Sequence, residues 1–109
     1  MLNKKIQLEN EKDILGFMEW AENAEEYINE FVEICDKYIK EYEPIYNLRW
    51  EYDWESNDGY SYLWMDIFID DNVDKCIEIM NIIDDVWYKE KIIEAGFEFF
   101  AFSIFPEFD

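Results

Sequence analysis

The sequence contains no histidine and no threonine, only three serines, and a single arginine, Arg49. Histidine is the side chain most often used for proton transfer near neutral pH and is the commonest transition-metal ligand. Without it the chain has no Ser-His or Cys-His nucleophile system, and it also has no glycine-rich phosphate-binding loop. We therefore expect a protein that is not an enzyme and that holds no cofactor and no metal.

Long apolar runs are also missing. No stretch has the length of a membrane span or of the apolar region of a signal peptide, which predicts a cytoplasmic protein. Its two cysteines, Cys35 and Cys76, form no CxxC pair and fall on apolar helical stripes. We expect them to be buried free thiols in a reducing compartment.

Basic side chains are few. Nine basic residues stand against 28 acidic ones, for a formal net charge of −19. Direct binding to nucleic acid is excluded because phosphate contacts require lysine and arginine. Anionic membrane surfaces would repel the chain as well.

Apolar side chains, by contrast, are plentiful. Half of the 109 residues are hydrophobic and 20% are aromatic, whereas acidic disordered tails have few aromatic residues. With three glycines, two prolines and no internal repeat, the chain is predicted to fold as a single domain over residues 1–109.

Two segments have helical periodicity. Between residues 13 and 42, apolar residues recur at alternating spacings of three and four, which predicts one long helix ended by Pro44. Two shorter helices broken near Asn23 are the alternative. A second helical stripe begins at Val73 and is expected to end between residues 88 and 95, with Gly96 as a candidate terminator.

The segment before the second helix has the spacing Asp70-x-Asn72-x-Asp74, which matches the first three ligand positions of an EF-hand loop. The match then fails, because Lys75 stands where the loop needs glycine and Asn81 where it needs a bidentate glutamate. We interpret the segment as a helix cap.

Strand periodicity occupies the rest of the chain. Residues 45–55 alternate strictly between apolar and polar side chains, residues 56–59 form a turn cluster, and residues 60–69 continue as a second strand. These strands are expected to pair as an antiparallel hairpin. Residues 97–105 read as a buried strand and residues 4–8 as a short one.

The resulting fold class is α+β, a two-layer sandwich with an antiparallel sheet and two helices on one face. Its order is α-β-β-α-β, or the ferredoxin-like β-α-β-β-α-β if residues 4–8 pair. The other face of the sheet would be open unless a partner or a second copy covers it.

Two acidic surfaces are candidate contact sites. The first is a ladder of acidic residues on one face of the long helix, at spacings of three and four, where like charges repel one another. Ordinary solvated faces mix both signs, so a ladder of one sign suggests a function. Its members are Glu19, Glu22, Glu26, Glu30 and Glu33.

The second surface is the open face of the sheet. If Leu63, Met65, Ile67 and Ile69 pack against the helices, the alternate residues of the two strands face outward together. Aromatic side chains would supply buried contact area, and the acids would supply steering and register. Arg49, Phe68 and Asp70 also face outward, and the candidate contact residues are Glu51, Asp53, Glu55, Tyr60, Tyr62, Trp64 and Asp66.

The placement of these charges favours a small acidic inhibitor that binds a basic nucleic-acid-binding protein as a mimic of nucleic acid. In charge and size the chain is similar to phage-encoded DNA-mimic inhibitors of host defence, such as anti-restriction and anti-CRISPR proteins, although no motif carries the similarity. An immunity protein or antitoxin against a basic nuclease toxin is the first alternative. A non-inhibitory subunit that homodimerises through the aromatic sheet face is the second.

Overall fold

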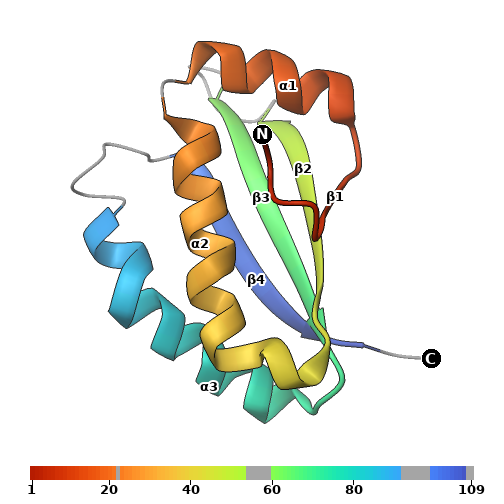
Figure 1. Cartoon of the computed structure of the whole chain (residues 1–109), viewed down its shortest axis with the longest axis vertical. Helices are drawn as coiled ribbons and strands as arrows, with labels where there is room; N and C mark the ends of the chain where they lie inside the picture. The colour runs from red at the N-terminus through yellow and green to blue at the C-terminus, as the bar shows by residue number, and fades with distance from the viewer. Residues whose placement is uncertain (22, 54–59, 92–98, 108–109) are drawn as a thin grey trace.

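A computed structural model covers the chain and describes residues 1–21, 23–53, 60–91 and 99–107. The described elements confirm an α+β fold with three helices and a four-stranded sheet (Figure 1). In chain order they are β1 (Ile6–Leu8), α1 (Glu11–Trp20), α2 (Ala24–Ile39), the 3-10 turn η1 (Lys40–Tyr42), β2 (Ile45–Asp53), β3 (Tyr60–Ile69), α3 (Val73–Ile83), the π-helical turn η2 (Asp84–Tyr88) and β4 (Phe100–Pro106).

The sheet has the strand order β1-β2-β3-β4 and is mixed. The hairpin β2–β3 is antiparallel, as predicted, but β1–β2 and β3–β4 are parallel pairs. The fully antiparallel sheet is therefore wrong, and the ferredoxin-like arrangement is not supported. A hairpin reverses the direction of the chain, so the two strands that it joins are antiparallel. A helical crossover instead carries the chain back to the end of the sheet where the previous strand began, so the next strand runs parallel to the previous one.

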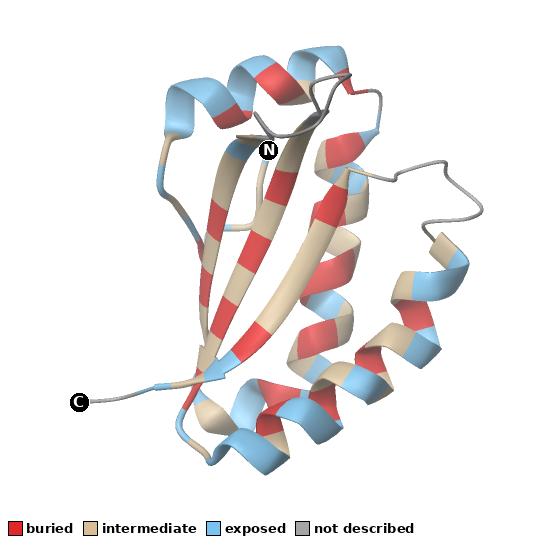
Figure 2. Ribbon diagram, turned by 180° about the vertical axis from the view of Figure 1, so that it is seen from behind, coloured by how far each residue is buried: buried red, intermediate tan, exposed pale blue. Residues whose placement is uncertain are grey.

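The helices cover only one face of the sheet. In Figure 1, α2 and α3 lie over the sheet and α1 lies across one end of it. Figure 2 shows the opposite face, over which none of the described helices lies. The expectation of helices on one face and an open second face is confirmed.

The chain breaks between α1 and α2. Ala21 is extended, with φ −90° and ψ 100°, and Asn23 has a left-handed φ of 65°, a conformation that asparagine tolerates better than most residues. The single helix over residues 13–42 is therefore wrong, and the alternative of two helices broken near Asn23 is confirmed. The break allows α1 to cross the end of the sheet while α2 runs along its face.

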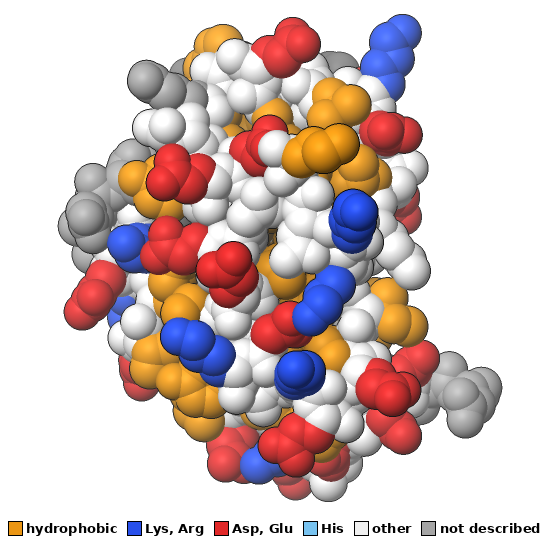
Figure 3. All heavy atoms as spheres, in the orientation of Figure 1, with side chains coloured by type: hydrophobic (Ala, Val, Ile, Leu, Met, Phe, Trp, Pro, Cys, Tyr) orange, Lys and Arg blue, Asp and Glu red, His pale blue; other side chains and the backbone are white. Residues whose placement is uncertain are grey.

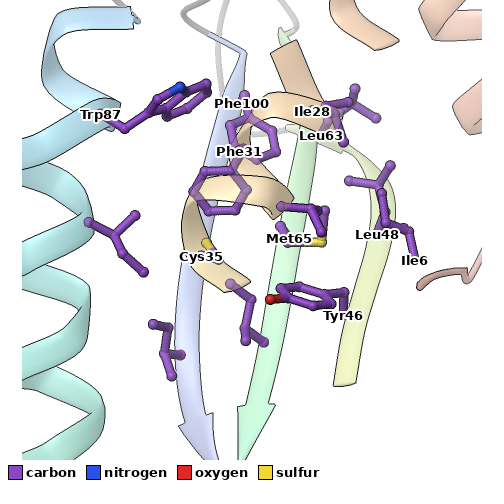
Figure 4. Close-up of a cluster of buried hydrophobic side chains, with 14 of the residues drawn as sticks. Ile6, Ile28, Phe31, Cys35, Tyr46, Leu48, Leu63, Met65, Trp87 and Phe100 are labelled. Carbon is purple, nitrogen blue, oxygen red and sulfur yellow. The ribbon is translucent and has the colours of Figure 1, made fainter. Parts of the chain in front are cut away.

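The core lies between the sheet and α2 and α3 (Figure 4). Phe31 is fully buried, and its ring centroid lies 5.1 Å from that of Phe100 and 5.3 Å from that of Trp87. Cys35 and Cys76 are both buried free thiols, as predicted, and burial raises the pKa of each. Among the described residues, no helix is long and apolar enough to cross a membrane.

Candidate functional site: the uncovered face of the sheet

The alternation of β2 and β3 divides their side chains between the two faces of the sheet. Leu63, Met65, Ile67 and Ile69 are fully buried beneath the helices, as predicted. The side chains opposite to them form what we call the uncovered face. Its described members are Gln7 of β1, Ile45, Asn47, Arg49 and Glu51 of β2, Tyr62, Trp64, Asp66 and Phe68 of β3, and Ala101, Ser103 and Phe105 of β4.

Arg49 organises the centre of the uncovered face. Its Nε donates to Asp66 Oδ2 at 2.9 Å, and its Nη1 donates to Glu51 Oε2 at 2.6 Å. Its guanidinium carbon lies 5.4 Å from the ring centroid of Trp64, a cation–π distance. Burial alone would lower the pKa of Arg49, but the hydrogen bonds to the two carboxylates raise it on balance.

Aromatic side chains occupy much of the remaining surface. The rings of Phe68 and Phe105 lie 5.6 Å apart, and Phe105 is 41% exposed. Tyr62 and Trp64 are half-buried. The indole Nε1 of Trp64 is buried without a hydrogen-bond partner among the described residues. Such an unpaired donor is uncommon, because leaving it unsatisfied is unfavourable.

The structure brings together Glu51, Tyr62, Trp64 and Asp66, four of the residues predicted for this surface. Asp53 and Tyr60 pair with each other at the end of the hairpin, but their side chains lie outside the described structure. The predicted Glu55 and the turn at 56–59 also lie outside the described residues. The carboxylates of Glu51 and Asp66 are already paired with Arg49 of the same chain. The alternation of the strands did not predict this pairing.

The acidic ladder predicted for the helix does not form. Glu19 lies on α1, whereas Glu26, Glu30 and Glu33 lie on α2 beyond the break, and Glu22 is outside the described residues. A straight ladder requires one continuous helix, and the turn at Asn23 separates its two parts.

Glu30 is moreover directed into the protein. Its Oε1 accepts a hydrogen bond from Trp87 Nε1 at 2.9 Å. The same oxygen forms an ion pair with Lys91 Nζ at 3.3 Å. This carboxylate joins α2 to the turn η2 and the residues that follow it. Only Glu26 and Glu33 remain exposed on α2 from the predicted ladder.

Basic side chains further divide the acids on the helical side. Lys37 and Lys40 are exposed at the end of α2, and Lys5 forms an ion pair with Asp36. Figure 3 shows basic side chains among the acidic ones on this side of the molecule. The helical side therefore carries mixed charge, unlike the one-sign surface that was predicted.

The segment before α3 is a helix cap, as predicted. The side chain of Asn72 accepts a hydrogen bond from the backbone N–H of Lys75 at 2.9 Å, and Asp74 lies in the first turn. Within the described part of the chain, no group of three or more histidine, cysteine or acidic side chains is placed to hold a metal ion.

A hollow of about 620 Å³ was not predicted from the sequence. It lies between α1 and the sheet and is lined by Phe17 and Trp20 of α1, Trp50 of β2 and the nearby Phe99. Gly16, in the interior of α1, also lines it and is the sequence feature that could have indicated it.

Comparison of the chain with protein-family models, with curated proteins and with solved structures found no match.

Proposed function

We propose that this chain is a small acidic inhibitor that binds a basic nucleic-acid-binding protein through the uncovered face of its sheet. The uncovered face is the observation that carries this proposal. It presents Tyr62, Trp64, Phe68 and Phe105 together on the two neighbouring strands β3 and β4, and no described helix lies over them. Tryptophan, tyrosine and arginine are enriched among the residues that dominate binding energy at protein interfaces.

The net charge of the chain determines which sign of charge its partner must carry. A chain of net charge −19 attracts a surface rich in lysine and arginine and repels nucleic acid. Grooves that bind DNA or RNA have such surfaces, because they must neutralise phosphates. We infer that exposed carboxylates on the uncovered face, such as Glu51 on β2, take the places of phosphates in such a groove.

We propose an inhibitor and not an enzyme, because binding a partner requires only the uncovered face. An immunity protein that neutralises a basic nuclease toxin would use the same surface, and the gene beside this one would separate the two roles. A homodimer through the uncovered face is less favoured, since it would bring together two chains that each carry a net charge of −19.

The test is capture of partners from a bacterial lysate at low and at high salt, followed by a nucleic-acid-binding assay on the purified partner. We expect a DNA- or RNA-binding protein or a nuclease that is recovered at low salt and lost at high salt. Adding the chain should displace nucleic acid from this partner. A partner that retains its nucleic acid while bound would contradict the proposal.

A matched pair of charge reversals tests which surface is used. Glu51→Lys reverses an exposed charge on the uncovered face, and Glu33→Lys makes the same change in charge on α2. We expect Glu51→Lys to weaken partner binding about tenfold or more and Glu33→Lys to weaken it only about two- to threefold, through the long-range field. Equal effects would show that the uncovered face is not the contact surface.

A further inference from the structure

The hollow beside α1 is a second site, separate from the uncovered face. Three of the aromatic rings in its wall contact one another, with centroid distances of 5.8 Å for Phe17–Trp20, 5.5 Å for Phe17–Phe99 and 5.9 Å for Trp20–Phe99. Trp20 is nevertheless 73% exposed. A volume of about 620 Å³ and a mainly apolar, aromatic lining are typical of sites for small organic ligands.

The fourth aromatic residue, Trp50, is held in place by hydrogen bonds to its backbone. The side chain of Asn10, just before α1, accepts a hydrogen bond from Trp50 N–H and donates one to Trp50 C=O, both at 2.8 Å. This pair of bonds fixes the start of α1 against β2. The parts of the wall that α1 and β2 supply are therefore held on regular secondary structure, as a preformed site requires.

Gly16 gives an independent indication that the hollow is kept open. Glycine destabilises the interior of a helix relative to alanine. Nothing in the described structure demands glycine there: its φ is not in the left-handed region, and a Cβ at this position would have no atom within 4 Å. The lack of a side chain at position 16 therefore serves neither the backbone nor the packing. It leaves space at the wall of the hollow.

The charges at the hollow indicate what kind of molecule fits it. The two charged residues in its lining, Lys12 and Asp13, have opposite signs, so the hollow has no net local charge. The chain as a whole repels anions. An uncharged ligand with aromatic rings would meet apolar walls and stack against the exposed ring of Trp20.

We propose that this hollow is a binding site for an uncharged aromatic small molecule and that Gly16 keeps it accessible. The probe for the test is N-phenyl-1-naphthylamine, an uncharged fluorophore whose emission increases in apolar surroundings. We expect saturable binding to the wild-type chain at one site, with energy transfer from tryptophan. Gly16→Leu should weaken binding at least tenfold, and Gly16→Ala should weaken it severalfold while raising the thermal unfolding midpoint by a few degrees.

Two controls make the result specific to the hollow. Glu19→Leu adds the same side chain on the same helix, but Glu19 does not line this hollow, so it should leave probe affinity unchanged. Anilinonaphthalene sulfonate, which has the same rings with one negative charge, should bind at least tenfold more weakly at low salt. Absence of saturable binding to the wild type would overturn the proposal. So would unchanged affinity in Gly16→Ala, the variant most certain to remain folded.

Discussion

The two faces of the same sheet use their alternating side chains differently. On the covered face, Tyr46, Leu48, Leu63 and Met65 are fully buried. On the uncovered face, the alternate residues include the half-buried Arg49 and Asp66 and the exposed Glu51. Burial of apolar area stabilises the fold, whereas half-exposed aromatic residues keep contact area available for another molecule. Strand alternation alone therefore separates residues that stabilise the fold from residues that keep exposed contact area.

The two faces also differ in whether their polar groups have hydrogen-bond partners. On the covered face, the Tyr46 hydroxyl donates to Asp36 Oδ1 at 2.7 Å, and Trp87 Nε1 donates to Glu30. On the uncovered face, Trp64 Nε1 has no partner in the described structure. Four experiments, ordered from the largest expected effect to the smallest, test this difference between the faces.

Replacing one phenylalanine on each side gives the largest contrast. Phe31→Ala removes a fully buried ring and should lower the free energy of unfolding by about 3–5 kcal/mol. Phe105→Ala removes a ring that is 41% exposed and should lower it by about 1 kcal/mol or less. Denaturant titration measures both values. Comparable losses would mean that the two faces do not differ in stability.

The bond between Glu30 and Trp87 should matter more than an exposed carboxylate on the same helix. Glu30→Ala leaves a buried indole N–H unpaired and should lower the free energy of unfolding by about 1–2 kcal/mol. Glu33→Ala, at an exposed position, should change it by less than about 0.5 kcal/mol. A loss in Glu33→Ala equal to that in Glu30→Ala would show that the bond to Trp87 does not distinguish the two carboxylates.

Tyr46 gives the covered face a pH dependence. Burial, followed by the hydrogen bond to Asp36, raises the pKa of the Tyr46 hydroxyl well above its ordinary value. The folded chain then keeps this proton at a pH where the unfolded chain loses it. The stabilisation is fully present below about pH 10 and is lost as the pH rises further.

Tyr46→Phe should therefore lower the free energy of unfolding by about 1 kcal/mol at neutral pH. It should also reduce the further loss of stability above about pH 10. Urea titrations at a series of alkaline pH values measure both effects. A variant that loses stability above pH 10 as steeply as the wild type would show that Tyr46 does not cause the loss.

Trp64→Phe should have the smallest effect on stability. The substitution removes apolar area but also removes the unpaired N–H, so the two contributions oppose each other. We expect the free energy of unfolding to change by less than about 0.5 kcal/mol, while affinity for the partner falls. A loss above about 2 kcal/mol would show that this N–H has a stabilising partner.

The local elements were largely predictable from the sequence. Strict alternation predicted β2, β3 and their antiparallel hairpin, and the buried set on β3 was assigned to the correct face. The cap at Asn72 was also predicted, because capping depends on residues within one helical turn. The helix break was open to two interpretations, since the apolar spacing continues through Asn23 without interruption.

The candidate site was predictable only in part. The outward direction of Glu51, Tyr62, Trp64 and Asp66 follows from the alternation of their strands. That Arg49 forms ion pairs with two of these residues does not follow from it, because the ion pair to Asp66 crosses between strands. The inward direction of Glu30 depends on Trp87, 57 residues later in the chain.

The sequence by itself determined the net charge, the residues of each strand face and the absence of histidine chemistry. All of these depend on composition or on short-range periodicity. Only the tertiary structure decided that β1 pairs in parallel with β2 and that β4 pairs in parallel with β3. The direction of Glu30 and the hollow beside α1 were also decided there. These features depend on contacts between residues far apart in the chain, and local periodicity carries no information about which distant segments pack together.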